Sequence, residues 1–255
     1  MNAADIVQRS ASGVAVEVVA VTGSTNADLL ARAPSLGAPL LLLAQRQTAG
    51  RGRAGRSWLA AEGGALTFSL AWKFDCPLQA LAGLPLAVGV LLAETLMAHG
   101  VAVQLKWPND VLKDGAKLAG VLIETQAAAG GGHWAVIGVG LNLLMPDELE
   151  RRIGRPAAGA PWLARMERAA LMATLLDGLA GGLLQFGQSG FAAFSARWNR
   201  LHAWTGEPVA VIDGDTELHA GLAAGVDERG ALLLDTASGR VAVLAGDVSL
   251  RRREV

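Results

Sequence analysis

The sequence predicts an α+β protein with a larger domain over residues 1–203 and a small β-barrel domain over residues 204–255. Three observations lead to this prediction. Up to Trp204, segments with strand patterns alternate with segments with helix patterns. After it, only short strand patterns remain, separated by tight turns. A loop of glycine and arginine, Gly50–Arg56, interrupts the alternation and carries the clearest functional pattern.

Apolar runs bounded by turn residues predict six strands in the larger domain, at 14–21, 39–44, 65–72, 101–107, 117–124 and 133–143. The first is rich in valine, and the second is continuously apolar, so we expect it to be buried on both faces. The fourth alternates apolar and polar side chains from Val101 to Trp107, which predicts one buried face. The last two are joined by a hairpin of small residues, AAAGGG.

Helical patterns in the same domain predict four helices, at 25–33, 78–99, 165–185 and 191–200. Ser24 or Thr25 is the expected N-cap of the first, because a hydroxyl there accepts a hydrogen bond from the first turn. Residues 145–162 are rich in proline and glycine and are expected to form a loop.

The strands expected after Trp204 lie at 208–212, 216–225, 231–235 and 240–244. Their turns are Asp213-Gly214, Glu228-Arg229-Gly230 and Ser238-Gly239. The arginines at 251–253 are expected to be a solvated end.

Composition excludes several classes of protein. The net charge of −1 gives no overall basic field for nucleic acid. Cys76 is the single cysteine, so the chain cannot form an internal disulfide, which fits a reducing compartment. The N-terminus has no signal-peptide pattern, and the apolar run 80–93 is too short for a membrane span. We therefore expect a cytoplasmic protein that binds neither membrane nor DNA.

The glycine/arginine loop predicts a ligand with a carboxylate or a phosphate. Glycine allows positive φ and close backbone approach, and the arginine fork binds both anions well. GRGRAG also fits the dinucleotide pattern G-x-G-x-x-G, but a strand rather than a helix is predicted after it, so that interpretation is disfavoured. There is no P-loop, HExxH or G-x-S-x-G pattern, and the four histidines are scattered.

Four further motifs each have a structural and a functional interpretation. Lys106-Trp107-Pro108-Asn109-Asp110 fits an ordinary turn, or a polar cluster where a strand ends. Lys117 begins an apolar strand, so it either snorkels to solvent or needs an anion nearby. Gly138-Val139-Gly140-Leu141-Asn142 indicates a bulge or a close approach by a ligand. Gly23-Ser24-Thr25-Asn26 fits a helix cap, or hydroxyls that face a ligand.

In this order and spacing, GSTN, QTAGRGRAGRSW, LKWPNDV, KLAGVLIE and GVGLNL resemble the catalytic region of biotin–protein ligases, from Gly23 to Leu143. The small C-terminal domain also fits that family. The resemblance implies a mixed β-sheet catalytic domain of the biotin/lipoate ligase type and an SH3-like C-terminal barrel.

The resemblance also implies roles for particular residues. Biotin-binding roles fall on Ser24, Thr25, Asn26, Gln47, Arg51, Gly52, Arg53, Lys117 and Gly120. Nucleotide-binding roles fall on Trp58, Lys106, Asn109, Asn142 and Trp162. Lys117, Arg53 and Asp110 are expected to be catalytic, with Asp110 orienting the acceptor amine or taking its proton.

The implied reaction joins biotin to ATP as biotinyl-5'-AMP, with release of pyrophosphate and with Mg²⁺ as cofactor. The biotinyl group then passes to a lysine of a biotin carboxyl carrier domain of a carboxylase. The ligands of Mg²⁺ stay unassigned. Only 22 residues precede GSTN, which predicts a ligase without a DNA-binding domain. An exposed edge strand would permit a homodimer.

Two alternatives stay open at this stage. A lipoate or octanoate ligase or transferase shares the fold, but the glycine-rich motif expected there is absent. A biotin sensor without catalysis is the other, although mere biotin binding would not require cations that face a phosphate.

Overall fold

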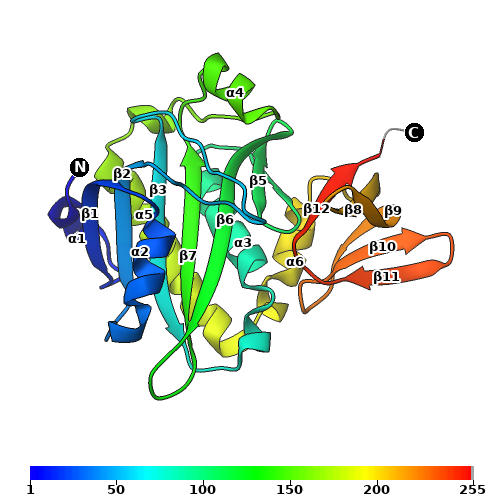
Figure 1. Ribbon diagram of the computed structural model, residues 1–255, viewed down its shortest axis with the longest axis horizontal. Coiled ribbons are helices and arrows are strands. Elements are labelled where there is room, and N and C mark those ends of the chain that lie inside the picture. Colours follow the sequence, from blue (N-terminus) through cyan, green and yellow to red (C-terminus); the bar gives the residue numbers. More distant parts are fainter. Residues whose placement is uncertain (254–255) are drawn as a thin grey trace.

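The computed structural model describes residues 1–253, which form a seven-stranded sheet and a five-stranded sheet (Figure 1). The strand order of the large sheet is β1-β2-β3-β7-β6-β5-β4. Its strands are β1 (Ala15–Thr22), β2 (Leu40–Gln47), β3 (Ala65–Phe74), β4 (Gln104–Lys106), β5 (Asp110–Lys113), β6 (Ala116–Ala127) and β7 (His133–Asn142). β1 and β2 are parallel and all other neighbours are antiparallel. The predicted mixed sheet is confirmed.

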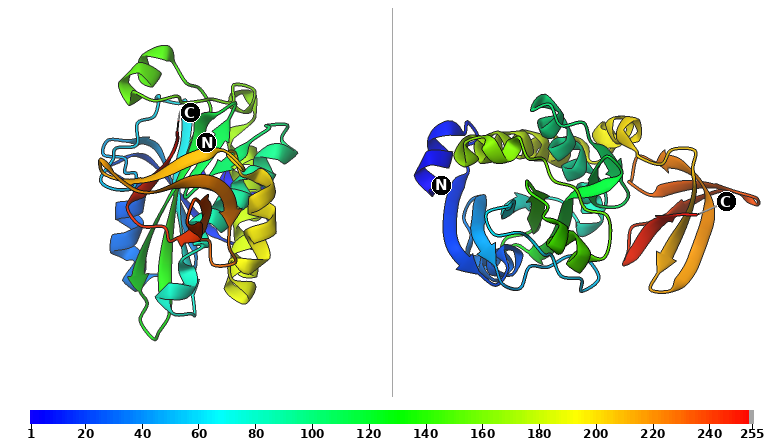
Figure 2. Two further views of the ribbon diagram at one scale, coloured as in Figure 1. Left: turned by 90° about the vertical axis from the view of Figure 1, so that its right-hand side faces the viewer. Right: turned by 90° about the horizontal axis from the view of Figure 1, so that it is seen from above.

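The helices lie on both faces of this sheet. They are α1 (Ala3–Arg9), α2 (Thr25–Arg32), α3 (Leu84–Ala98), α4 (Asp147–Ile153), α5 (Arg168–Ser189) and α6 (Ala192–Leu201), with short 3₁₀ turns η1 (Ala33–Ser35), η2 (Leu78–Leu81) and η3 (Leu163–Arg165). Seen from above, α3, α5 and α6 form a layer along one face (Figure 2). α2 packs on the opposite face, where Leu29 meets Leu40, Leu42 and Val136. The part of that face beyond α2 lies under the glycine/arginine loop.

The small sheet consists of β8 (Pro208–Asp213), β9 (Thr216–Val226), β10 (Leu232–Thr236), β11 (Gly239–Val243) and β12 (Val248–Arg252). Its order, β11-β10-β9-β8-β12, leaves β11 and β12 as the two edges, so closure into the predicted barrel is not confirmed for the described residues. The two sheets share one apolar core. Trp107 is fully buried in it and donates from Nε1 to the Gly230 carbonyl at 3.2 Å.

Several predicted elements need correction. The helix predicted at 78–99 is a 3₁₀ turn followed by α3, with a break at Gly83, where a Cβ would lie 2.4 Å from Phe191. Only 104–106 of the strand predicted at 101–107 pairs as β4, although its alternation is correct, because Val101 and Leu105 are buried.

The loop predicted at 145–162 contains α4, and the sequence prediction there was wrong. Acidic residues in the first turn, arginines in the last turn and Gly154 in the left-handed conformation as a C-cap all favour this helix. The sequence analysis also missed α1, β5 and β12. Arg251 and Arg252 therefore belong to a strand rather than to a solvated tail, although their side chains are exposed.

Two helical stretches, Leu78–Ala98 and Arg168–Ser189, are long and apolar enough to cross a membrane by length and composition alone. Most of each apolar window is buried inside the protein, 67% and 61% respectively. This burial is typical of core helices, so the test gives little support for a membrane span.

Candidate functional site

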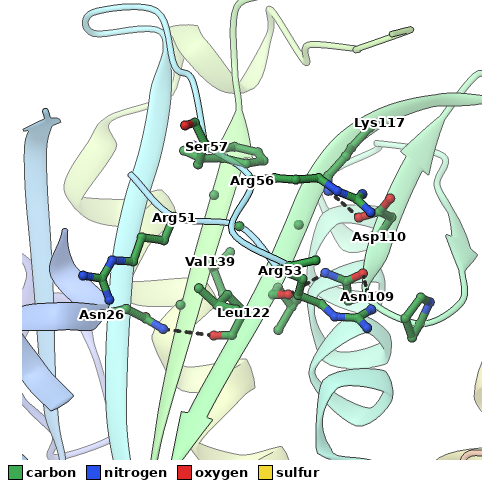
Figure 3. A pocket seen from close by; sticks show the side chains of 18 of the residues that line it. Asn26, Arg51, Arg53, Arg56, Ser57, Asn109, Asp110, Lys117, Leu122 and Val139 are labelled. Carbon is green, nitrogen blue, oxygen red and sulfur yellow. Dashed lines mark hydrogen bonds and ion pairs between the residues drawn. The ribbon is translucent and has the colours of Figure 1, made fainter. Parts of the chain in front are cut away.

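A cavity lies on the sheet face that α2 leaves uncovered, beneath the glycine/arginine loop (Figure 3). Thirteen of the fifteen residues singled out from the sequence line it, namely Ser24, Thr25, Asn26, Gln47, Arg51, Gly52, Arg53, Trp58, Lys106, Asn109, Asp110, Lys117 and Gly120. Segments far apart in the chain therefore meet in one site.

One end of the cavity is a buried network of uncharged polar groups. Gln47 Oε1 accepts from the Thr25 backbone N–H at 2.7 Å and from its hydroxyl at 3.1 Å. The Thr25 hydroxyl also contacts the Ser69 hydroxyl at 2.7 Å, and Ser69 donates to Asn26 Oδ1 at 2.6 Å. Because Oε1 of Gln47 is occupied in this way, its amide N–H groups remain available to donate to a ligand.

Both amide N–H groups of the Asn26 side chain are engaged at this end of the cavity. Its Nδ2 donates to Glu124 Oε2 at 2.9 Å and to the Leu122 carbonyl at 3.3 Å. Asn26 lies against Gly138, where a Cβ would come within 2.3 Å of its Oδ1. Glycine at 138 is therefore required for this side chain to reach its partners.

Trp58 forms the middle of the cavity wall. A Cβ at Gly140 would lie 2.2 Å from the Trp58 ring, so the glycine of β7 makes room for the indole. Gly120 has the same role for Lys117, whose ammonium would be 2.8 Å from a Cβ there. The glycines flagged in the sequence thus mark close approaches of side chains over β6 and β7.

Charged groups gather at the other end. Lys117 forms an ion pair with Asp110, and both side chains are about 15% exposed (16% and 15%). The Lys117 ammonium also lies 5.7 Å from the centre of the Trp58 ring, within range of a cation–π interaction. The snorkelling interpretation of Lys117 is therefore wrong, because its ammonium is directed into the site.

Further cations surround this pair. Burial is the main cause that lowers the pKa of the Lys106 ammonium, and Asp110 opposes it. Three neighbouring cations add to the lowering, Lys117, Arg155 and Arg56. Four cations around one carboxylate leave an excess of positive charge, which suits a ligand that carries several negative charges.

The glycine/arginine loop is folded back on itself. Trp58 N–H donates to the Gly50 carbonyl at 2.9 Å and Gly52 N–H to the Arg56 carbonyl at 2.6 Å. The turn between them has positive φ at Ala54 and Gly55. Its arginines leave in different directions, Arg53 toward Asn109 and Arg56 toward the Lys117–Asp110 pair (Figure 3).

Two of the fifteen residues lie outside this cavity. Asn142 borders an adjoining hollow that Trp58 and Lys117 also line, and its Nδ2 donates to the Lys117 carbonyl at 3.4 Å. Trp162 lines neither hollow. It is 40% exposed, and its Nε1 donates to the His99 carbonyl at 3.3 Å. The geometry therefore gives no support to a ligand contact by Trp162.

The sequence analysis missed several residues that line the cavity, among them Ser69, Leu122, Arg155, Asp247 and Ser249. Ser69 could have been found, because Thr67 and Ser69 are polar residues two apart in an otherwise apolar strand. Arg155 and Asp247 had no local pattern, since only the tertiary fold brings them to the site.

No cluster of three or more histidine, cysteine or acidic side chains that could hold a metal ion occurs among residues 1–253. Mg²⁺ at nucleotide sites is usually bound by one or two carboxylates together with substrate phosphates, and it keeps several waters. Asp110, which lines the cavity, fits that lesser requirement.

Comparison with known proteins agrees with this geometry. Residues 18–142 match the Biotin/lipoate A/B protein ligase family, and residues 205–251 match the Biotin protein ligase C terminal domain. The chain is 37% identical over 247 residues to the biotin--[acetyl-CoA-carboxylase] ligase of Mycobacterium tuberculosis, covering 91% of this chain and 88% of that protein. It is 35% identical over 249 residues to the bifunctional ligase/repressor BirA of Escherichia coli, covering 95% of this chain and 76% of that protein.

Solved structures give the same result. The biotin protein ligase from Aquifex aeolicus in complex with biotin and ATP superposes with a TM-score of 0.77 at 28% identity, covering 93% of this chain and 99% of that one. The fold and the site thus define a protein ligase of the biotin/lipoate type. The chain belongs to the biotin protein ligase family, and it is an enzyme that ligates biotin.

Proposed function

We propose that this enzyme joins the carboxylate of biotin to the α-phosphate of ATP and then transfers the biotinyl group to a lysine of a carboxylase carrier domain. The observation that carries the proposal is the position of the Lys117–Asp110 pair. It lies in one cavity that has mainly uncharged hydrogen-bonding groups at one end and a cluster of cations around the pair at the other. A ligand with a neutral polar head and a carboxylate tail fits this order.

The neutral pocket suits the ureido ring of biotin, which has one carbonyl acceptor and two N–H donors. The amide N–H groups of Gln47 and the hydroxyl of Ser24 are assigned to the ureido oxygen. Asn26 is assigned a supporting role, because both of its amide N–H groups donate to protein partners, Leu122 and Glu124, and its oxygen accepts from Ser69. Its contribution is to hold the pocket in shape.

In the first step, a biotin carboxylate oxygen attacks the α-phosphorus, the α–β phosphoanhydride bond breaks, and pyrophosphate leaves with the bonding electron pair. Two anions must approach each other, so fixed positive charge is the main requirement. We assign Lys117 to the point where the carboxylate and the α-phosphate meet, and the neighbouring cations Lys106, Arg56 and Arg155 to neutralisation of the leaving group. Bound Mg²⁺ would supply further charge neutralisation on the phosphates.

Biotinyl-5'-AMP is a mixed anhydride that water hydrolyses, so the site must exclude water. The glycine/arginine loop covers the cavity, and Arg53 extends from it to Asn109.

In the second step the acceptor lysine nitrogen attacks the biotinyl carbonyl carbon, and AMP leaves as the C–O bond breaks. The amine proton must be removed, and we assign this role to Asp110, which lines the cavity beside Lys117.

Asp110→Ala is expected to slow transfer from preformed biotinyl-5'-AMP to the carrier by about 10²-fold, because general-base assistance contributes typically 10²–10⁴-fold. Single-turnover transfer to the carrier measures this step without the first one. Asp215→Ala is the matched control, since Asp215 is exposed in the β8–β9 turn and does not line the cavity. A near-normal transfer rate for Asp110→Ala would count against the assigned role.

Gly140→Ala is expected to lower the rate of adenylate formation by about tenfold or more, because the new methyl group displaces the Trp58 ring and overpacking costs about 1–3 kcal/mol. Pyrophosphate exchange at varied ATP concentration measures the effect. Gly181→Ala is the control, as a Cβ there meets nothing within 4 Å. Equal rates for the two variants would mean that Trp58 need not lie over Gly140 during the reaction.

The protein partner is inferred from the names of the relatives, and the cellular location from the cysteine content. The names of the relatives from Mycobacterium tuberculosis and Paracoccus denitrificans support a carboxylase carrier as the acceptor. The single cysteine supports action in the cytoplasm. β1 and β4 are the edges of the large sheet, and pairing at such an edge is the route we propose for a homodimer.

Incubation of the enzyme with biotin, ATP, Mg²⁺ and an apo carrier domain tests the overall function. We expect one biotinyl group per carrier, detected by intact mass, and none when ATP is omitted. Biotin binding without any carrier modification would favour the sensor function instead.

A further inference from the structure

The turn between β11 and β12, Ala245–Asp247, meets the glycine/arginine loop. The Arg53 guanidinium bridges the two parts of the protein. Its Nη1 donates to Asn109 Oδ1 at 3.2 Å, and its Nη2 donates to the Gly246 carbonyl. These contacts join the loop of the large sheet to the edge of the small sheet.

This bridge lies on the boundary between two hollows. The cavity described above is on its inner side, and a groove open to solvent is on its outer side. Arg53, Asn109 and Asp247 line both, so they form part of the wall between them. A molecule that leaves the cavity toward the groove must pass this wall.

The charged groups around the Arg53 guanidinium favour its contact with the β11–β12 turn. Burial lowers the pKa of its guanidinium, while Asp247 and Asp110 act in the opposite direction. A partly buried guanidinium needs acceptors for its N–H groups, and Asn109 and Gly246 provide two. Asp110 is already paired with Lys117. Asp247 forms no ion pair within residues 1–253 and is therefore the carboxylate available to Arg53.

We propose that the β11–β12 turn is the catch that holds the glycine/arginine loop closed, with Asp247 as the positioning residue for Arg53. The small sheet then contributes directly to retention of the acyl-adenylate. This inference rests on the proposed function, since it requires that an adenylate is formed and held. It adds that escape of the adenylate is controlled from outside the large sheet.

The test compares Asp247→Lys, Asp247→Asn and Asp247→Glu in the full chain. Each enzyme makes its own biotinyl-5'-AMP from α-labelled ATP, and dissociation is followed by rapid filtration after a chase with unlabelled ligand. Asp247→Asn should speed dissociation roughly twofold to fivefold, because Asp247 is exposed and solvent screens its attraction for Arg53. Asp247→Lys should speed it further, and Asp247→Glu should retain the wild-type rate. In Asp247→Asn and Asp247→Lys the dissociation rate should change by a larger factor than the rate of adenylate formation.

Asp215→Lys is the matched control, because Asp215 is exposed in the β8–β9 turn of the same sheet and does not line the cavity. It should dissociate at the wild-type rate. If biotinyl-5'-AMP dissociates at the same rate from Asp247→Lys and Asp215→Lys, the β11–β12 turn does not hold the loop closed. The proposed ligase function would be unaffected by that result. Absence of any adenylate from the wild-type enzyme would overturn the proposed function and this inference together.

Discussion

Replacing Lys117 with alanine is expected to lower the rate of biotinyl-5'-AMP formation by about 10²- to 10³-fold, the usual loss when one preorganised charged donor is removed from a transition state. Lys117 is the cation closest to both reacting anions in our proposal. Its removal also leaves Asp110 buried without its partner, which adds a carboxylate where negative charge must accumulate.

Pyrophosphate exchange measures the first step of Lys117→Ala, and transfer from preformed adenylate measures the second. We expect the first to fall far more than the second, because charge repulsion between two anions is confined to adenylation. Lys113→Ala is the control, since Lys113 lies in the neighbouring strand and pairs with Asp114. An exchange rate for Lys117→Ala within threefold of wild type, as a rough limit, would remove Lys117 from the chemistry.

Arg53→Gly is expected to turn the enzyme into an unselective biotinylating agent. The change removes the bridge from the loop to Asn109 and Gly246, so the loop opens and biotinyl-5'-AMP escapes before a carrier binds. The free adenylate then acylates any accessible lysine amine. Labelling of a bystander protein without a carrier domain, followed by intact mass, should rise by about tenfold or more, which corresponds to roughly 1.4 kcal/mol of lost loop closure.

Arg53→Lys separates charge from geometry. A lysine keeps the attraction to Asp247 but cannot donate to Asn109 and Gly246 in a planar fork, so bystander labelling should be intermediate. If Arg53→Gly labels only the carrier, the loop does not contain the adenylate in this protein.

Much of the site could be predicted from sequence because its polar residues are concentrated in short motifs at the ends of apolar strands. Ser24 to Asn26, the glycine/arginine loop and Lys117 each stand out against apolar neighbours, and the fold brings them into one cavity. The glycines at 138 and 140 were predicted to mark a bulge or a close approach by a ligand. Their partners, Asn26 and Trp58, became evident only from the packing.

The rest depended on tertiary structure. Asp247 is an exposed residue in a turn, and Arg155 follows a helix that proline and glycine obscured in the sequence. Nothing local marks either as part of a site, since their importance comes from the approach of the small sheet and of the segment after α4. β12 was missed for a similar reason, because its arginines look like a solvated tail until the strand is seen to pair with β8.

Trp162, in contrast, was predicted as a site residue but lies outside the cavity. Its sequence position suggested contact with the nucleotide, but its ring is partly exposed near Lys113, 5.9 Å from that ammonium, and its indole N–H is bonded to His99. An order of motifs predicts which segments take part in a site better than it predicts which side chain within a variable segment reaches the ligand.

Mass spectrometry of the reaction products shows directly whether this cavity activates biotin as an acyl-adenylate. The enzyme is incubated with ATP and Mg²⁺ and, in separate reactions, with biotin, lipoate and octanoate, and the products are extracted and weighed. We predict an acyl-adenylate with biotin and none with the other two acids. An adenylate of lipoate or octanoate instead would show that the cavity activates a different acid. Biotin bound without any adenylate would show that the cavity does not activate biotin.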